Sequence, residues 1–452
     1  MNPCYTDDAD TNTLPEIKGG SFVQEKCIDI NGKSLYAFTN EALNSFCIAL
    51  YVRSGSLFEP KELNGITHLL EHTIFRNIKK KYGGKLYELL ALNGLSFSGS
   101  TYREFVRFAL EGPLFGYDFA CDILCSLFDS LAVSKREFDL EKQRIKAEIR
   151  EKDERNSLQY HFSKAIWEDT NNERTVLGYC RVLDGVSLSK LETYRCQMFS
   201  AENCFFYVTG GICPSNLDRL AQKLRNLEIP VTGNANKNEI TLSPRFFHRN
   251  CFVKVRDSRY SEVCLGVDLD LQKHDESVLE LMYDVLFSGD NCLLFKYLSE
   301  DNPLTYSFSG TLERYDNAGC LQLNFETAPG KIEEALQAVV AAINDLKCGR
   351  FQFEATLNYV LAGHITVQDN PEILNWERAY LGHILKTTPI DYSAFRLGRF
   401  SSVTKENIMQ AAQEVFRTDN ITIVVEANKR KLKPEYLREI LEQLNEQFEQ
   451  KG

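Results

Sequence analysis

Residues 96–111 read SFSGSTYREFVRFALE, and this stretch holds the pattern that decides the fold. Its periodicity predicts two strands, Ser96 to Thr101 and Phe105 to Glu111, that pair as a hairpin. Two further strands are predicted upstream, at Ser34 to Thr39 and at Phe46 to Arg53. Because hairpin strands run in opposite directions, the stretch predicts a mostly antiparallel sheet.

Predicted helices lie between and after these strands, and the same order of elements returns in the second half of the chain. The first-half helices are predicted at Ile66 to Phe75, Leu86 to Leu92, Gly116 to Leu131 and Lys135 to Asp153. The second half has predicted strands at Cys251 to Val255, Glu262 to Leu269, Tyr306 to Leu312 and Cys320 to Phe325. Its helices are predicted at Glu276 to Phe287, Leu293 to Leu298, Ile332 to Leu346 and Phe353 to Val367. The repeated order indicates a duplication.

Strand hairpins that alternate with helix pairs predict the fold class. We expect an α+β protein of two homologous domains, each a mostly antiparallel sheet with helices packed on one face and each forming half of a clamshell. The domains are predicted at residues 1–230 and 240–452. The stretch from Ile229 to Glu239 between them is polar and has no periodicity, which is typical of a linker.

Composition excludes several classes of partner. Of 452 residues, 52 are Lys or Arg and 63 are Asp or Glu, so the net charge of −11 leaves no broad basic field for nucleic acid. The longest apolar runs, Cys47 to Val52 and Ala338 to Ile343, are shorter than the roughly 18 residues that span a membrane. Met1 to Pro15 lacks the pattern of a secretory signal, and the 14 cysteines are thinly spread. We therefore expect a cytoplasmic protein with reduced cysteines.

One short motif carries a specific chemistry: His68-Leu69-Leu70-Glu71-His72. On a helix, residues four apart share a face, so both imidazoles can reach one ion, with Glu71 beside them. His-x-x-Glu-His is the order of the inverted zincins. The alternative is a surface helix whose histidines bind nothing. Of these, the motif favours a metal site.

Two imidazoles do not complete a catalytic zinc site, which needs a third protein ligand and an open position for water. A capping box at Ser134 and Glu137 begins a helix that carries Glu141 and Glu148 on one face. One carboxylate could bind the ion while the other orients a ligand. Alternatively, both belong to a solvated charged face together with the other glutamates of this helix. The residues alone leave this choice open.

The motif and its surroundings resemble those of a known family. With Arg53-Ser54-Gly55-Ser56 and Asn64-Gly65-Ile66-Thr67 before it, the motif is similar to that of the insulinase/pitrilysin metallopeptidases, in the mitochondrial-processing-peptidase-like branch. The segment Glu141 to Ile149 resembles the one that holds the third zinc ligand in that family. The resemblance extends to Leu293 to Ala328 and thus covers most of the chain.

The resemblance implies one zinc ion per chain, with Glu148 as the third ligand beside His68 and His72, and with Glu141 as a supporting carboxylate. A bound zinc ion activates water and polarises the scissile carbonyl. Glu71 is placed to act as the catalytic base and then as the acid. The second half has no His/Glu pair in the helix Glu276 to Phe287, so we expect it only to close a chamber over the substrate.

Substrate contacts are also implied by the resemblance. In the family, an edge strand of the zinc-binding half pairs with the bound peptide. The similar segment here consists of Phe97, Ser98, Gly99, Ser100 and Thr101. An ordinary internal strand is the alternative for this segment. Tyr306 matches a substrate-holding tyrosine of the family, but Ser299 stands where the family has an arginine.

Two functions are compatible with these residues. The leading hypothesis is a zinc endopeptidase that hydrolyses short or unfolded polypeptides, such as a precursor or leader peptide. The alternative is a non-catalytic or partner-dependent subunit of a heterodimeric peptidase, which Ser299 favours because serine lacks the family's positive charge. We expect a homologous partner subunit and favour a heterodimer over a homodimer. The basic residues from Arg76 to Lys81 are expected in a solvated loop.

Overall fold

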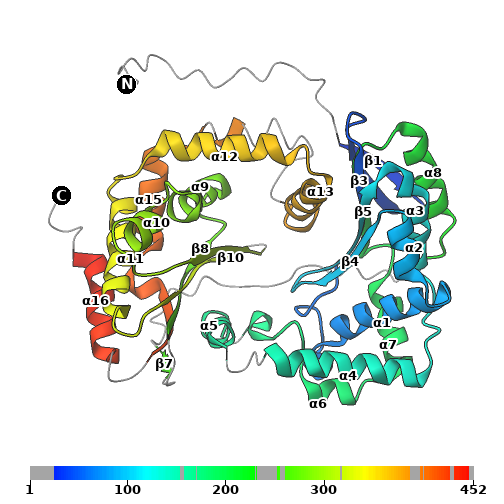
Figure 1. The fold of residues 1–452 in the computed structure, drawn as a ribbon, viewed down its shortest axis with the longest axis horizontal. Coiled ribbons are helices and arrows are strands. Elements are labelled where there is room, and N and C mark those ends of the chain that lie inside the picture. Colours follow the sequence, from blue (N-terminus) through cyan, green and yellow to red (C-terminus); the bar gives the residue numbers. More distant parts are fainter. Residues whose placement is uncertain are drawn as a thin grey trace.

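The structure contains two sheet-based domains that lie side by side (Figure 1). This computed structural model describes residues 25–152, 157–168, 170–229, 231, 252–254, 260–315, 318–386, 398–400, 402–427 and 432–446. The first sheet has six strands in the order β1-β2-β6-β3-β5-β4, and the second has five in the order β7-β11-β8-β10-β9. Within these ranges, no helix has both the length and the apolar composition needed to cross a bilayer.

Five strands of each sheet follow one topology, and the first sheet adds β1 at its edge. The first contains β1 (Lys26–Ile30), β2 (Lys33–Thr39), β3 (Ser45–Val52), β4 (Ser96–Thr101), β5 (Val106–Pro113) and β6 (Cys204–Gly210). The second contains β7 (Phe252–Lys254), β8 (Ser261–Asp270), β9 (Phe308–Arg314), β10 (Ala318–Thr327) and β11 (Ile421–Glu426). Each sheet has one parallel pair, β2 with β6 and β7 with β11, and all its other pairs are antiparallel. The predicted duplication and sheet type are confirmed.

Helices cover one face of each sheet and form its main core. In the first domain these are α1 (Ile66–Lys81), α2 (Leu86–Leu92), α3 (Tyr117–Ser126), α4 (Lys135–Lys152), α6 (Cys180–Asp184), α7 (Leu188–Met198) and α8 (Pro214–Arg225). In the second they are α9 (Glu276–Phe287), α10 (Leu293–Phe295), α11 (Ile332–Lys347), α12 (Phe353–Val367), α15 (Lys405–Val415) and α16 (Pro434–Glu446). Single helical turns lie at Lys61–Leu63, Leu114–Gly116, Asn171–Glu173, Lys296–Glu300, Tyr380–Ile384 and Thr418–Asn420.

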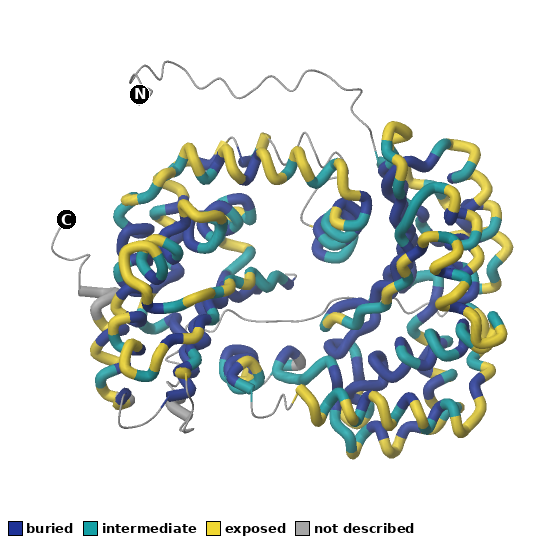
Figure 2. Tube along the Cα trace, viewed as in Figure 1, coloured by how far each residue is buried: buried dark blue, intermediate teal, exposed yellow. Residues whose placement is uncertain are grey.

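The opposite face of each sheet is covered by a helix from the other half of the chain, which the sequence pattern does not indicate. Helix α5 (Leu158–Ile166) packs on β8 and β11, where Gly266 leaves room for the ring of Phe162. Helix α13 (Pro371–Ala379) packs on β3 and β6. Both helices lie between the two sheets in Figure 1. Because both of their faces are covered, β3 and β6 are almost wholly buried (Figure 2).

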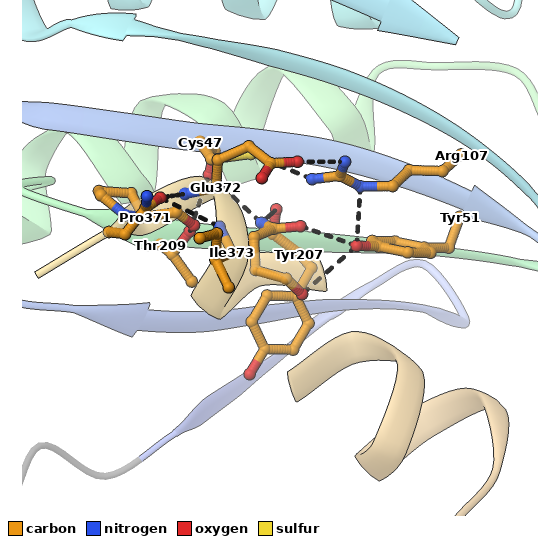
Figure 3. Close-up of polar contacts among 10 residues, drawn as sticks. Cys47, Tyr51, Arg107, Tyr207, Thr209, Pro371, Glu372 and Ile373 are labelled. Carbon is orange, nitrogen blue, oxygen red and sulfur yellow. Dashed lines mark hydrogen bonds and ion pairs between the residues drawn. The ribbon is translucent and has the colours of Figure 1, made fainter. Parts of the chain in front are cut away.

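Polar contacts fix α13 on the first sheet (Figure 3). The Tyr51 hydroxyl donates to Asn375 Oδ1 at 2.9 Å and accepts from Arg107 Nε at 3.0 Å. The Arg107 guanidinium also pairs with Glu372 at 2.7 Å. Thr209 Oγ1 donates to the Pro371 carbonyl at 2.6 Å. Since a buried polar group is costly unless it is paired, these contacts select one docking position.

A glycine contact recurs in the two domains and reflects the duplication. A Cβ atom at Gly99 of β4 would lie 2.4 Å from the ring of Phe75 in α1. A Cβ atom at Gly310 of β9 would lie 2.4 Å from the ring of Phe287 in α9. In both domains, glycine thus allows the edge strand to approach the first long helix.

The boundary between residues 230 and 240 stays a prediction. Except for residues 229 and 231, the predicted linker from Ile229 to Glu239 lies outside the described residues, as does the segment Met1 to Pro15. Every cysteine in the described part of the chain is free.

Candidate metal centre

The helix α1 places His68 and His72 one turn apart. His68 is buried, whereas His72 is partly exposed, with a quarter of its side chain accessible. The two rings lie edge to face, with centroids 4.7 Å apart. Burial, and then the neighbouring His72, lower the pKa of His68 to about 4. At neutral pH, His68 is therefore a neutral imidazole, the form that binds metals.

Glu148 of α4 completes a three-ligand arrangement. Its Oε2 atom lies 3.7 Å from His68 Nε2 and 3.8 Å from His72 Nε2. Ligand atoms about 2.1 Å from a tetrahedral ion are about 3.4 Å apart, so the observed spacing suits one zinc-sized ion. Within the described ranges, His68, His72 and Glu148 are the only group of three or more His, Cys, Asp or Glu residues that could hold a metal ion. Two nitrogens and a carboxylate oxygen are donors that zinc accepts.

Glu141, one of the two glutamates between which the sequence does not choose, lies behind His72. Its Oε2 atom is 3.7 Å from His72 Nδ1, on the side of the ring away from Glu148. Its Oε1 atom accepts from Arg76 Nε at 2.6 Å. Burial raises the pKa of Glu141, but hydrogen bonds with His72 and Arg76 outweigh this effect and bring the pKa below its usual value. This carboxylate is thus ionised and placed to orient the His72 ring.

Glu71 lies on the same face of α1 and contacts the edge strand. Its Oε2 atom accepts from Thr101 Oγ1 at 2.6 Å. Burial raises the pKa of Glu71, while the Thr101 hydrogen bond opposes this shift. A carboxylate with a raised pKa is better matched to exchange protons near neutral pH. Thr101, predicted to touch substrate, contacts the predicted base in this structure.

The predicted peptide-binding strand is β4, which lies at the edge of the first sheet. Beside it is a cavity of about 380 Å³ whose lining includes His72. Its lining comprises Glu71, His72, Phe75, Arg76, Lys79, Tyr87, Phe97, Ser98, Gly99, Glu141 and Arg144. Within β4, Ser96 to Thr101 are exposed or only partly buried. An edge with accessible backbone next to Glu71 can accept an extended peptide.

Tyr306 is not brought to this cavity. Its side chain is fully exposed in the segment before β9, and it is not part of the cavity lining. Ser299, in place of the family's arginine, donates to the Thr305 carbonyl at 3.4 Å. The roles of Tyr306 and Ser299 in substrate binding therefore stay predictions.

Two contacts were missed at the sequence level, one to Glu141 of the site and one to the start of α1. The expectation that residues 76–81 form a solvated loop is wrong: α1 continues to Lys81, and Arg76 faces Glu141. Glu59 lies under the start of α1, where it accepts hydrogen bonds from the Gly65 and Thr67 amides at 2.7 and 2.9 Å. Burial raises the pKa of Glu59, and these hydrogen bonds oppose the shift. The spacing from Glu59 to Thr67 matches no capping pattern that would have indicated this contact.

Two models of one family match consecutive stretches of the chain. Residues 37–179 match "Insulinase (Peptidase family M16)", and residues 185–355 match "Peptidase M16 inactive domain". The chain belongs to peptidase family M16. The resemblance inferred from the motif is thereby confirmed, and M16 is a family of zinc metallopeptidases.

Relatives of this M16 chain include bacterial and mitochondrial proteins. It is 22% identical over 321 residues to an uncharacterized zinc protease of Bacillus subtilis, YmxG, with 70% of this chain and 77% of that protein covered. It is also 22% identical over 330 residues to the mitochondrial-processing peptidase subunit beta of Rattus norvegicus, with 70% and 66% covered.

Solved structures share the M16 fold. A protease from Helicobacter pylori superposes with a TM-score of 0.78 at 18% identity, over 90% of this chain and all of that one. The periplasmic protease PqqL from Escherichia coli gives a TM-score of 0.74 at 14% identity, over 94% of this chain but only 50% of its own. At these identities the likeness concerns the fold, and it confirms the predicted architecture of two homologous domains.

Proposed function

We propose that this chain is a zinc-dependent endopeptidase that hydrolyses short or unfolded polypeptides, such as a precursor or leader peptide. The observation that carries the proposal is the convergence of His68, His72 and Glu148, whose ligand atoms all lie within 4.8 Å of one another. The exposed edge of β4 beside them supports an extended substrate, because strand addition binds peptide backbone with little demand on sequence.

In this proposal, His68 Nε2, His72 Nε2 and a Glu148 carboxylate oxygen hold the ion. When bound, zinc lowers the pKa of its water and polarises the scissile carbonyl. The Glu71 carboxylate takes the proton from the attacking water and passes it to the leaving amine nitrogen. Thr101 holds the Glu71 carboxylate in place through its hydroxyl. Glu141 keeps the His72 ring oriented, and no covalent bond to the enzyme forms.

Substitution of Glu71 by Gln tests the proposed role of this residue. Glutamine has nearly the same shape but cannot accept a proton, so we expect the variant to retain metal and to lose about a hundredfold to ten-thousandfold in turnover. Metal content by elemental analysis and cleavage of a quenched peptide provide the two measurements. Substantial residual proteolysis by this variant would exclude Glu71 as the base.

The metal itself is tested by chelation. We expect the purified chain to contain one zinc ion, to lose peptide cleavage after treatment with a chelator and to regain it when zinc is restored. Full activity of chelator-treated protein that is shown to be free of metal contradicts the proposal.

We further propose that the active form contains a homologous partner subunit, in a heterodimer rather than a homodimer. Ser299 supplies no positive charge where the family has an arginine, and a related chain could supply it. The match to only half of the PqqL chain supports pairing, because that protein has room for two such units. Mass measurement in solution and assay of the purified chain alone test this; a fully active monomer would refute it. A chain that contains zinc but cleaves only with its partner would instead support the partner-dependent alternative.

A further inference from the structure

The helix that carries the two histidines begins without a capping side chain of its own. Its N-cap residue is Gly65, which has a φ of 95° in the left-handed region. A Cβ atom there would lie only 2.7 Å from the Cα atom of Gly178. The usual capping residues Ser, Thr, Asp and Asn are thus disfavoured at this position. The first-turn N–H groups of α1 therefore need an acceptor from elsewhere.

Glu59 supplies that acceptor from outside the helix. Its Oε2 atom accepts from the Gly65 amide at 2.7 Å and from Asn64 Nδ2 at 2.8 Å, while its Oε1 atom accepts from the Thr67 amide at 2.9 Å. The residue is 3% exposed, and its own carbonyl accepts from Arg174 at 2.8 Å. A buried carboxylate at a helix N-terminus also interacts favourably with the helix dipole.

The position of His68 depends on this first turn. His68 is the third residue of α1 and directly follows Thr67, whereas His72 lies one turn further into the helix. A loosened first turn would therefore displace His68 and leave His72 in place. The distance of 3.7 Å between His68 Nε2 and Glu148 is the part of the ligand geometry that such a displacement would change.

We propose that Glu59 is a positioning residue of the metal centre, which fixes the first turn of α1 and through it the place of His68. The inference rests on the proposed metal site at His68, His72 and Glu148. Glu59 acts through the helix backbone, because it accepts hydrogen bonds from the backbone amides of Gly65 and Thr67. A residue with a merely structural role would change the stability of the fold and leave the affinity for metal unchanged.

The test is titration of the metal-free, full-length chain with Co²⁺ and Zn²⁺. In Glu59→Gln one of the two carboxylate oxygens becomes an NH₂ group. That group cannot accept a hydrogen bond, so the Gly65 or the Thr67 amide loses its acceptor. We expect this variant to bind metal about tenfold to a hundredfold more weakly and to change the visible absorption of bound Co²⁺. Glu59→Asp keeps the charge on a shorter side chain and should show a smaller loss. Glu62→Gln, in the exposed turn next to Glu59, is the matched control and should bind as the wild type does.

Other outcomes separate the two proposals. If Glu59→Gln binds Co²⁺ and Zn²⁺ with wild-type affinity and spectrum, the positioning role is refuted, even where its unfolding temperature is lower. If Glu59→Gln does not fold, Glu59→Asp decides: unchanged affinity refutes the role and weakened affinity supports it. If the wild-type chain binds neither metal, the proposed function fails instead.

Discussion

Arg76 and Glu141 form the ion pair behind His72, on the side away from the proposed ion. The Glu141 side chain is 3% exposed, and Arg76 reaches it with two nitrogen atoms, Nε and one terminal nitrogen. Arg144 lies 3.5 Å from the same carboxylate, but its side chain is 65% exposed. The partly buried guanidinium of Arg76 is therefore the one that compensates the charge of Glu141.

Substitution of Arg76 by Ala should leave the Glu141 carboxylate buried with a poor partner. We expect the free energy of unfolding to fall by about 2 kcal/mol and the metal affinity to fall about tenfold or more. Arg144→Ala is the matched control, with an expected loss of at most about 1 kcal/mol. Urea unfolding and zinc titration measure both effects. Equal effects of the two substitutions would contradict this account.

The sequence predicts part of the site, and physical reasons limit the rest. Helical periodicity places Glu141 and Glu148 on one face, but it does not decide which of them approaches the histidines. That choice depends on how α4 lies against α1, and it came only from the family resemblance. Sequence reasoning does not find Glu59 and Arg76, because their partners are set by tertiary packing and by a helix that ends at Lys81 and not at Phe75.

At the level of elements, the close approach of β4 to α1 brings Thr101 to Glu71. Gly99 allows this approach, since a Cβ atom there would meet Phe75 at 2.4 Å and Glu71 Oε1 at 3.0 Å. The Phe75 ring has little freedom to move away, because it packs between Phe97 and Phe108 with centroid distances of 4.4 and 6.0 Å.

The substitution Gly99→Ala should separate strand from helix. We expect a loss of about 1 to 3 kcal/mol in unfolding free energy from overpacking, together with reduced peptide cleavage because Glu71 is displaced. Gly330→Ala is the control, since a Cβ atom at Gly330 meets nothing within 4 Å. Thermal unfolding and the peptide assay are the measurements. A fully active and stable Gly99→Ala variant would show that β4 and α1 have room for a Cβ atom at this position.

The sequence predicts most helices and strands, but it does not predict which sheet each helix packs on. The bounds predicted for α2, β4, α9 and α12 are those observed, because a clear period and a local stop signal define each of them. Helices α5 and α13 were not predicted. An apolar stripe indicates that one face of a helix is buried, but it does not identify the sheet that buries it. Their placement on the opposite domain is therefore a tertiary property.

For the molecule as a whole, Glu25 joins the start of the first sheet to the end of α13. It pairs with His383 at 3.0 Å and with Arg378 at 3.4 Å, and it accepts a hydrogen bond from Tyr207. Burial raises the pKa of Glu25, but these three partners together hold it below the usual value. The ionised carboxylate therefore stabilises the contact between the two halves.

This contact predicts a dependence on pH. Because the pKa of Glu25 is lower in the folded chain, its stabilisation is complete above the ordinary value of 4.5 and is lost as the pH falls through the folded value. Glu25→Gln should be less stable than the wild type by about 3 kcal/mol at pH 7, since the buried Arg378 guanidinium loses the negative charge of Glu25 that faces it. The difference should narrow below about pH 4.5 in urea unfolding. Exposed Glu41→Gln is the control, and a difference that is constant with pH would contradict the assignment.

Because α5 and α13 each pack on the sheet of the other domain, the two halves of the gene depend on each other. A truncated gene that stopped near residue 230 would encode a polypeptide in which the face of β3 and β6 that α13 covers is exposed, and we expect this polypeptide to aggregate. Each half of the coding sequence thus encodes one helix, α5 or α13, that covers the sheet of the other domain. Neither half of the gene would therefore encode a domain whose sheet is covered on both faces.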